Sequence, residues 1–506
     1  MNPVLLSQVS LKQPSRLRDL PRWCVLSASA LLLSGCMVGP KYTKPAVSLA
    51  PTTSPATQPA NQYDQYKETD PNWHQANPAD AALKGEWWTI FNDPQLTALE
   101  VQVPKTNQTL RAAEANFRTA RAQIKINHAD LYPTLGVAPF VGGERESNSR
   151  PYFNPPSPNN GLADLLVPVD FNYEVDLWGR IRRNIAASKE ETQASAADLA
   201  NVLLSLQTEL ALDYFEVRSA DAAKKLLDDT VQQYVEALRV TTNRFEGGIT
   251  SKADVSQAET QLQAAMVQAS DIAATRAQFE HAIAILTGQP PAVFSLPPVV
   301  ATIAPPSIPV GLPSELLERR PDIAAAERRI NEANERIGIA RAAYFPTLNL
   351  SAAAGFEGSS ATNLFNRSSF IYSLGPTLGE TFFDAGRRAG ISQQAYAQYD
   401  ETAAQYRQTA LTAFQQVEDN LVLLRVLADE AKQQHAATAA AQEAEQIFNN
   451  RYVGGVDNYL QVITAQTTAL NNERNEIDIM RRRMDASVLL IKALGGGWTT
   501  AQLPTY

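Results

Sequence analysis

Residues 244–248 read Arg-Phe-Glu-Gly-Gly, and residues 451–455 read Arg-Tyr-Val-Gly-Gly, 207 positions further along the chain. Each pentapeptide lies inside a long stretch that contains no proline, residues 179–289 for the first and 377–503 for the second. A proline in a helix interior costs about 3 kcal/mol, so its exclusion over these lengths indicates helices. The paired glycines then predict a turn that joins two long helices in each stretch.

Apolar residues in both stretches recur at helical spacing. In the first stretch, a seam with steps of three and four consists of Val255, Ala258, Leu262, Ala265, Ala269 and Ile272. In the second, a seam that Arg474 and Arg481 interrupt consists of Leu460, Ile463, Thr467, Leu470, Ile477, Met484, Val488 and Ile491. Such spacing is typical of coiled coils. A helix from about residue 180 to 246 would be roughly 100 Å long, which favours a rod or tunnel over a compact domain.

The same repeat extends toward the N-terminus. Residues 120–135 match residues 333–348 at an offset of 213, through shared Ala, Ile and Pro-Thr-Leu positions. Gly179-Arg180 matches Gly386-Arg387 at an offset of 207. The sequence therefore predicts two internal repeats, each with a helix, two strands and two long helices.

Between these matches lie short apolar segments with partial alternation. They span residues 135–141 and 165–175 in the first repeat, and 348–356 and 370–378 in the second. Alternation predicts strands with one apolar face, and their lengths approach the 9–11 residues of a membrane strand. Two hairpins of a soluble β-domain are the alternative. Six aromatic residues are candidates for membrane-interface side chains or for ordinary sheet packing: Phe140, Phe171, Tyr173, Phe356, Phe370 and Tyr372.

Four membrane strands cannot close a barrel, because a membrane tolerates no open sheet edge. Several copies must therefore share one barrel, and three copies supply 12 strands. The predicted fold class is mixed: an all-α coiled-coil barrel that forms a tunnel, continuous with a shared membrane β-barrel that has 12 strands if three copies contribute. The same association would bury the apolar helix seams.

The N-terminus has the composition of a lipoprotein signal. Basic residues precede an apolar run, residues 23–33, which is too short to cross a hydrocarbon core of about 30 Å. Leu33-Ser34-Gly35-Cys36 then looks like a bacterial lipobox. We expect cleavage before Cys36 and acylation of this cysteine, for example with palmitate. Because Met37 follows it rather than aspartate, we expect sorting to the outer membrane of a Gram-negative bacterium.

These features predict a division of the chain. The parts are a lipoprotein signal peptide (1–35), an extended N-terminal tether (36–92), a first repeat (93–289), a proline-rich linker (290–320), a second repeat (321–497) and a C-terminal tail (498–506). Strands are expected at about 134–176 and 347–381, and long helices at about 179–288 and 386–494.

Several segments resemble the TolC-type outer-membrane efflux proteins, in particular the lipidated OprM/NodT-like branch. They are residues 36–42, Trp87-Trp88 with Phe91 and Asp93-Pro94, and residues 173–180, 319–323 and 383–387. The resemblance implies a passive, gated conduit that exports drugs and other toxic small molecules and so contributes to antibiotic resistance. It also implies a homotrimer in outer-membrane lipid, with a periplasmic adaptor (membrane-fusion) protein and an inner-membrane pump of the resistance-nodulation-division type as partners.

Candidate site residues follow from the repeat and the resemblance. Gly179 and Gly386 relieve the backbone where strand becomes helix, and Arg180 and Arg387 beside them form surface salt bridges or contact lipid phosphates. At the tunnel tip, Gly247, Gly248, Gly454 and Gly455 form the turns, and Arg244 and Arg451 cap helix C-termini or dock the adaptor. The candidate gate residues are Asp254, Asp457, Leu460 and Thr464, the last standing where OprM-like tips often have an aspartate.

Composition narrows the remaining classes. The chain has 53 acidic against 44 basic side chains, which argues against a nucleic-acid binder. Four dispersed histidines and two cysteines give no metal-ligand spacing, and no catalytic fingerprint is present, so neither an enzyme nor a cofactor besides the lipid on Cys36 is expected. The exit duct of a type I protein secretion system has the same architecture and stays open as an alternative. A structural coiled-coil lipoprotein of the envelope would explain the heptads but not the hairpins.

Overall fold

A computed structural model describes residues 37–45, 85–145, 147, 161–300, 305–306 and 319–506. The chain divides into two units. The first comprises Met1–Tyr42, Gln123–Ser188 and Glu332–Tyr399, and the second comprises Thr43–Ala122, Lys189–Asn331 and Asp400–Tyr506. The predicted signal peptide and Cys36 lie outside the described residues, so the lipidation of Cys36 stays a prediction.

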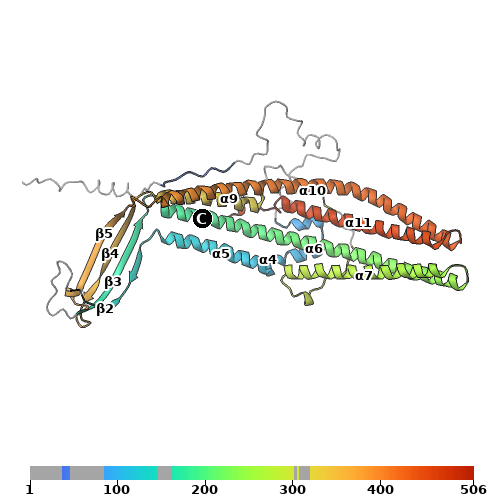
Figure 1. Cartoon of the computed structure of the whole chain (residues 1–506), viewed down its shortest axis with the longest axis horizontal. Helices are drawn as coiled ribbons and strands as arrows, with labels where there is room; N and C mark the ends of the chain where they lie inside the picture. The colour runs from blue at the N-terminus through green and yellow to red at the C-terminus, as the bar shows by residue number, and fades with distance from the viewer. Residues whose placement is uncertain (1–36, 46–84, 146, 148–160, 301–304, 307–318) are drawn as a thin grey trace, which may run out of the picture. The chain divides into compact units, whose positions relative to one another are not determined.

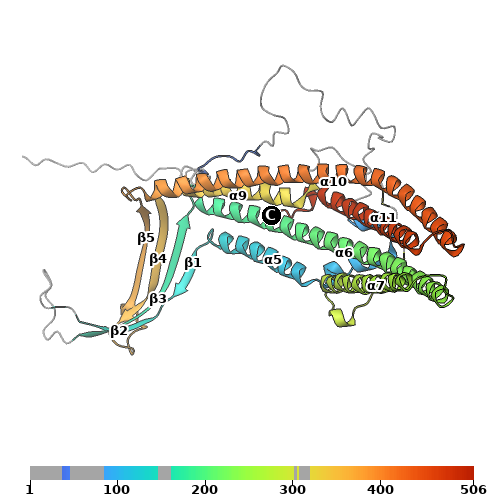
Figure 2. The same cartoon turned by 45° about the vertical axis from the view of Figure 1, so that its right-hand side comes forward.

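The first unit contains an antiparallel sheet. Its strands are β1 (Thr134–Val137), β2 (Phe140–Glu144), β3 (Leu162–Val175), β4 (Thr347–Gly358) and β5 (Phe370–Gly379). The order is β1-β3-β4-β5, with β2 also paired to β3, and β3, β4 and β5 run side by side (Figures 1 and 2). A 3₁₀ turn, η3 (Arg367–Ser369), precedes β5.

The predicted single strand at 135–141 is wrong, because two short strands occupy that segment. β1 ends with Val137 opposite Val169, and β2 begins with Phe140 opposite Leu166, in one continuous register along β3. Pro139 lies in the gap, and the register places Pro168 across from the gap. Neither proline has the N–H donor that a sheet ladder needs, so the pairing is interrupted there.

Strand pairing separates the sheet into an apolar face and a polar face. The residues on the apolar face include Leu135, Val137, Val169, Phe171, Tyr173, Leu350, Ala352, Ala354, Phe356, Phe370, Tyr372 and Leu374. The polar face includes Asp170, Asn172, Glu174, Asn349, Ser351, Ser373 and Thr377. Five of the six predicted aromatic residues thus share the apolar face, whereas Phe140 is in register with Leu166 on the other.

Helices form the second unit, and four of them continue into the first. These four are α5 (Gln108–Ala129), α6 (Arg180–Glu246), α9 (Pro321–Ala342) and α10 (Arg387–Val453). The others are α3 (Pro94–Glu100), α4 (Val103–Thr106), α7 (Lys252–Leu286), α11 (Tyr459–Ala493) and the 3₁₀ turns η1 (Trp87–Phe91), η2 (Pro291–Val293) and η4 (Thr500–Gln502). Within the described ranges, no helix combines the length and hydropathy that crossing a membrane requires.

The internal repeat is confirmed by the long helices. α6 and α10 each have 67 residues, and α7 and α11 each have 35. Each pair folds back at its glycine turn, and the two turns lie at the same end of the second unit (Figure 1). Leu227 of α6, Ala269 of α7 and Leu470 of α11 share one buried cluster, so the two hairpins pack against each other.

The predicted tether is wrong at its C-terminal end. Trp87, Trp88 and Phe91 form the turn η1 and are buried in the main core, together with Leu210 and Phe215 of α6. Large aromatic side chains remove enough apolar surface from water to fix such a segment, although the chain before it contains several prolines. Folded structure on this side therefore begins before residue 93.

The two predicted apolar seams, one on α7 and one on α11, are buried to different extents. The α7 seam is buried from Val255 to Ala269. On α11 the predicted seam is buried at Leu470 and from Met484 onward, but Leu460 is 54% exposed. Near the tip, α11 instead buries Tyr459 and Val462, because these pack against Tyr452 of α10.

Candidate functional site

Two aspartates lie just before the long helices α6 and α10, where strands end, and their carboxylates bond to backbone N–H groups at the helix starts. Asp176 accepts hydrogen bonds from the backbone N–H groups of Ile181 and Arg182 at 3.1 and 3.0 Å. In the second repeat, Asp384 accepts from the N–H groups of Gly386 and Arg388, both at 3.1 Å. Each carboxylate satisfies N–H groups that have no partner within the helix and adds a favourable charge at the helix N-terminus.

The glycines at these junctions have the backbone conformation that the corner requires. Gly179 has φ +80° and Gly386 has φ +89°. Arg180 forms a bidentate pair with Glu174, with N–O distances of 2.9 and 2.7 Å, which is the salt-bridge arrangement rather than a free cation. Arg387 is exposed at the start of α10.

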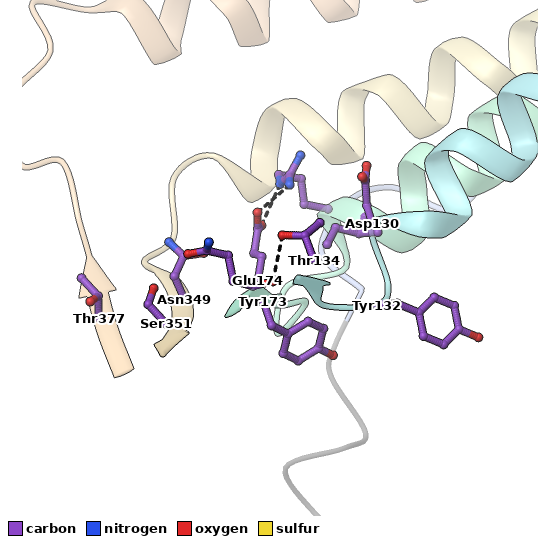
Figure 3. A pocket seen from close by; sticks show the side chains of 11 residues that line it. Asp130, Tyr132, Thr134, Tyr173, Glu174, Asn349, Ser351 and Thr377 are labelled. Atoms are coloured by element: carbon purple, nitrogen blue, oxygen red, sulfur yellow. Dashed lines mark hydrogen bonds and ion pairs between the residues drawn. The ribbon is translucent and has the colours of Figure 1, made fainter. Parts of the chain in front are cut away.

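A cavity of about 520 Å³ opens on the polar face of the sheet, near the strand ends that lead into the helices. Figure 3 shows polar side chains from neighbouring strands along it, among them Asn349, Ser351 and Thr377. The rest of its lining consists of Asp130, Tyr132, Thr134, Asn172, Tyr173, Glu174, Arg180 and Ile181. Hydroxyl, amide and carboxylate groups therefore line this face, which suits water and polar solutes.

Sequence reasoning missed the docking of the segment that begins at Met37. The N–H of Val38 donates to the Trp178 carbonyl at 3.2 Å, and the Asn334 side chain donates to the Pro40 carbonyl at 3.4 Å. Gly39 lies so close to Gly338 of α9 that a Cβ on Gly39 would be 2.8 Å from the Gly338 Cα. A glycine inside the Cys-Met-Val-Gly-Pro motif was the available signal, because it permits close backbone approach.

Both hairpin tips use a glycine with positive φ. Gly248 has φ +71° and Gly455 has φ +76°, and each follows another glycine, Gly247 or Gly454. After the first turn, Ser251 and Asp254 form a capping box at the start of α7. Asp254 also accepts a hydrogen bond from the Thr250 hydroxyl, so its carboxylate is engaged in starting the helix.

Arg244 links the two tips. Its guanidinium donates to the carbonyls of Tyr452 at 2.9 Å and Val453 at 3.3 Å, the last residues of α10. It also lies 4.6 Å from the centroid of the Tyr452 ring. The predicted capping role therefore applies to the C-terminus of the neighbouring hairpin's helix and not to α6 itself.

Arg451 has a local partner. Its guanidinium donates to both carboxylate oxygens of Asp457, at 2.6 and 3.1 Å. These hydrogen bonds hold the pKa of Asp457 below its ordinary value. Asp457 is therefore charged and already paired with Arg451 across the Gly454-Gly455 turn.

Leu460 and Thr464 lie one helical turn apart on α11. Both are exposed, and the Thr464 hydroxyl donates to the Leu460 carbonyl at 2.9 Å. Tyr459 beside them is buried against Tyr452, and its burial raises its pKa to about 12. The tip thus combines a buried aromatic pair with an exposed leucine and an exposed threonine.

Comparison with known proteins agrees with this architecture. The model of the outer membrane efflux protein family matches residues 101–289 and 312–496. A probable efflux pump outer membrane protein of Pseudomonas putida, TtgC, is 30% identical over 477 residues, covering 94% of this chain and 95% of the relative.

Solved structures give the same result. The outer-membrane channel OprN matches with a TM-score of 0.77 and 27% identity, over 92% of this chain and all of that one. The open state of the MtrE channel of Neisseria gonorrhoeae matches with a TM-score of 0.75 and 26% identity, over 92% of this chain and 99% of that one. The matches span nearly the whole length of the chain and both repeats. The chain therefore belongs to the outer membrane efflux protein family.

Proposed function

We propose that this chain is the outer-membrane conduit of a tripartite efflux system, and that it exports drugs and other toxic small molecules. The observation that carries the proposal is the two-faced sheet, whose apolar face suits lipid and whose polar face suits an aqueous passage. The conduit is passive and gated, performs no catalytic step, and takes its energy from an inner-membrane pump.

Three copies build the complete channel. β1 and β2 follow one another along β3 and count as one barrel strand, so each copy contributes four strands and three copies give a 12-stranded barrel. The paired long hairpins give a helical tunnel. Among the described residues, β1 and β5 each have one edge with no neighbouring strand, and this supports the assembly because open edges are not tolerated in a membrane. An acyl group on Cys36 adds an anchor in the same outer membrane.

A periplasmic adaptor and a pump of the resistance-nodulation-division type are the proposed partners. Relatives such as TtgC are named as outer-membrane proteins of efflux pumps, which supports this assignment. The hairpin tips, with Arg244, Arg451 and the exposed turn residues Ile249 and Val456, are the proposed docking end.

The native mass of protein extracted from the outer membrane tests the proposal. We expect a species of three chains, which forms ion-conducting pores in planar lipid bilayers. Deletion of the gene should increase susceptibility to at least one antibiotic or solvent, and the intact chain should restore resistance. A monomer in mild detergent without conductance would contradict the shared barrel. Labelling with radioactive palmitate, lost in Cys36→Ser, tests the anchor separately.

A further inference from the structure

The corner between β5 and α10 lacks an ion pair that its equivalent in the first repeat has. There, Arg180 donates to both carboxylate oxygens of Glu174. The repeat offset of 207 residues converts Arg180 into Arg387 and Glu174 into Thr381. Threonine has no charge, and within the described part of the chain no hydrogen bond or ion pair involves the Arg387 guanidinium. The second repeat therefore presents an unneutralised arginine at this corner.

The place of Arg387 in the helix makes its charge unfavourable. Arg387 is the first residue of α10, and the first turn contains no acidic residue. Because a helix N-terminus carries a partial positive charge, a cation there is favourable only when an anion lies close by. Arg388 has such anions, since it pairs with Asp384 at 2.7 Å and with Glu380 at 3.3 Å. Arg387 is exposed, so its counter-charge has to come from outside the described residues.

Two large apolar side chains precede this arginine in the segment that joins β5 to α10. Phe382 is 93% exposed and Phe383 is 87% exposed. They follow the apolar face of β5, whose last member, Leu378, is exposed as well. Aromatic side chains at the end of a membrane strand are typical of the interface between hydrocarbon and water. The segment therefore extends the apolar face to where lipid head groups would lie in a membrane.

The end of α9 adds a third aromatic side chain and a second arginine. The guanidinium of Arg388 lies 5.4 Å from the centroid of the Tyr344 ring and donates to the Thr381 carbonyl at 2.6 Å, so Tyr344 borders the same segment. One helical turn before it, Arg341 donates to the Tyr396 hydroxyl and lies 5.6 Å from the centroid of that ring. No carboxylate pairs with Arg341 among the residues that the structure describes. We call this set of two arginines and three aromatic residues the corner patch: Arg341, Tyr344, Phe382, Phe383 and Arg387.

We propose that the corner patch binds an anionic phospholipid of the leaflet that faces the periplasm, with the phosphate at the two arginines and the acyl chains on the two phenylalanines. A guanidinium suits a phosphate because its N–H groups match the phosphate oxygens in pairs. Charge complementarity and continuity with the apolar face of the sheet both favour a lipid as the occupant. A second copy of the chain would have to bring carboxylates to the same place. The inference rests on the proposed membrane channel and adds a lipid that holds one corner of each copy.

Lipid retention by the intact trimer measures the binding. Trimers released from nanodiscs with equal amounts of phosphatidylglycerol and phosphatidylcholine should retain mainly phosphatidylglycerol in native mass spectrometry. Arg387→Gln should reduce the retained phosphatidylglycerol severalfold, whereas Arg387→Lys, which keeps the charge, should retain most of it. Arg407→Gln, at an exposed arginine further along α10, is the matched control and should retain as much as the parent. Equal losses in Arg387→Gln and Arg407→Gln, or no loss in either, would overturn the site. If Arg387→Gln does not assemble, Arg341→Gln takes its place.

A photo-crosslinking side chain identifies the occupant. p-Benzoylphenylalanine in place of Phe383, irradiated in outer membranes, should add the mass of one phospholipid to the chain. The same side chain in place of Phe245, beside the glycine turn of the first hairpin, should not. A cross-link between two chains from position 383 would place a second copy there and overturn the inference. Conducting trimers that retain no phosphatidylglycerol would also overturn it and would leave the proposed channel intact. A native mass of one chain without conductance would overturn the channel itself.

Discussion

Arg244 and Arg451 occupy equivalent positions in the two repeats, yet their guanidinium groups have different partners. Arg451 pairs with Asp457, whose equivalent in the first repeat is Thr250. Arg244 therefore has no local carboxylate at that position, and it reaches the carbonyls at the end of α10 instead. The helix-dipole argument predicts that a cation is favourable at a C-terminus but not at which one.

Breaking the pair at the second turn should loosen the tip. We expect Asp457→Ala and Arg451→Ala each to raise the leak conductance of single channels in bilayers. Solvent screens an exposed pair, so its contribution is small and the open fraction should rise only modestly. Because the pKa of Asp457 is lowered from 3.8, the pair should persist at pH 5 and be lost only at more acidic pH.

Lys432→Ala is the matched control for that effect, because it breaks an exposed pair with Asp429 in the middle of α10. The double variant Asp457→Ala/Arg451→Ala should leak no more than either single variant. If both single variants and the double variant keep the parent's conductance and antibiotic susceptibility, this pair is not part of the gate.

Glu100 is a buried acid that no sequence pattern predicted. It is fully buried at the end of α3, and neither carboxyl oxygen has a hydrogen-bond partner among the described residues. Burial raises its pKa well above 4.5. The folded protein therefore holds the proton more tightly than the unfolded chain, and this stability is lost as pH rises from about 4.5 through the folded-state pKa.

Glu100→Gln should remove that pH dependence. The amide cannot ionise, so the variant should melt at a higher temperature than the parent at pH 8 and at nearly the same temperature at pH 4.5. At pH 8, the free energy of unfolding of the variant should exceed that of the parent by about 1.4 kcal/mol for each unit by which folding raises the pKa of Glu100. Only the part of this increase that lies below the pH of the measurement counts. Circular dichroism melts of detergent-extracted protein at the two pH values measure it, and an equal change at both would contradict a neutral Glu100.

At the scale of elements, helices were predictable and strand interruptions were not. The exclusion of proline and the paired glycines predicted a helix from about 180 to 246, and α6 spans Arg180–Glu246. The split between β1 and β2 depends on two prolines, Pro139 and Pro168, that lie beside the same gap only after pairing, which no local pattern specifies. The position of the proline-rich segment after residue 290 was not predictable from a local pattern either. Arg276 and the buried Asp221 hold the backbone of Leu296 and Val299 there.

The contact between α9 and α6 depends on a glycine within a helix. A Cβ on Gly338 would overlap the side chain of Arg183, which is buried and pairs with Glu335 at 2.8 Å. Gly338→Ala should therefore displace Arg183 and release the segment at Gly39, lowering stability by about 1–3 kcal/mol. Faster proteolysis within residues 37–45 and a lower melting temperature are the expected readouts.

Gly390→Ala is the matched control for Gly338→Ala. Gly390 also lies inside a helix, α10, but a Cβ there would meet no atom within 4 Å. Alanine at this position should raise stability by about 0.5–1 kcal/mol, because it restricts the unfolded chain. Equal effects of the two substitutions on stability would show that the close approach at Gly338 does not contribute to stability.

At the scale of the whole molecule, the repeat and the apolar segments predicted the architecture, and the resemblance of several short motifs predicted the family. Contacts between equivalent parts of the two repeats were not predictable, because each joins residues more than 150 positions apart, as Trp178 with Pro346 and Arg244 with Tyr452 do. The candidate gate residues were located from the repeat and from the resemblance to the family. Their pairing, which decides how Asp457 acts, depended on the folded turn.

The apolar face of the sheet requires a non-aqueous environment, and this gives a test of the assembled channel. Leu374 lies near the middle of β5 on the apolar face and is 81% exposed in the single chain, whereas Ser373 lies beside it on the polar face. Arginine at a lipid-facing position near the bilayer midplane costs about 2–4 kcal/mol, while a lumen-facing arginine meets water. Leu374→Arg should therefore reduce the amount of trimer in the outer membrane severalfold. Ser373→Arg should leave that amount unchanged and shift the ion selectivity of the pore toward anions. Because the two residues are neighbours on one strand, general damage to the sheet would affect both variants alike, and only a lipid-facing side predicts that their effects separate.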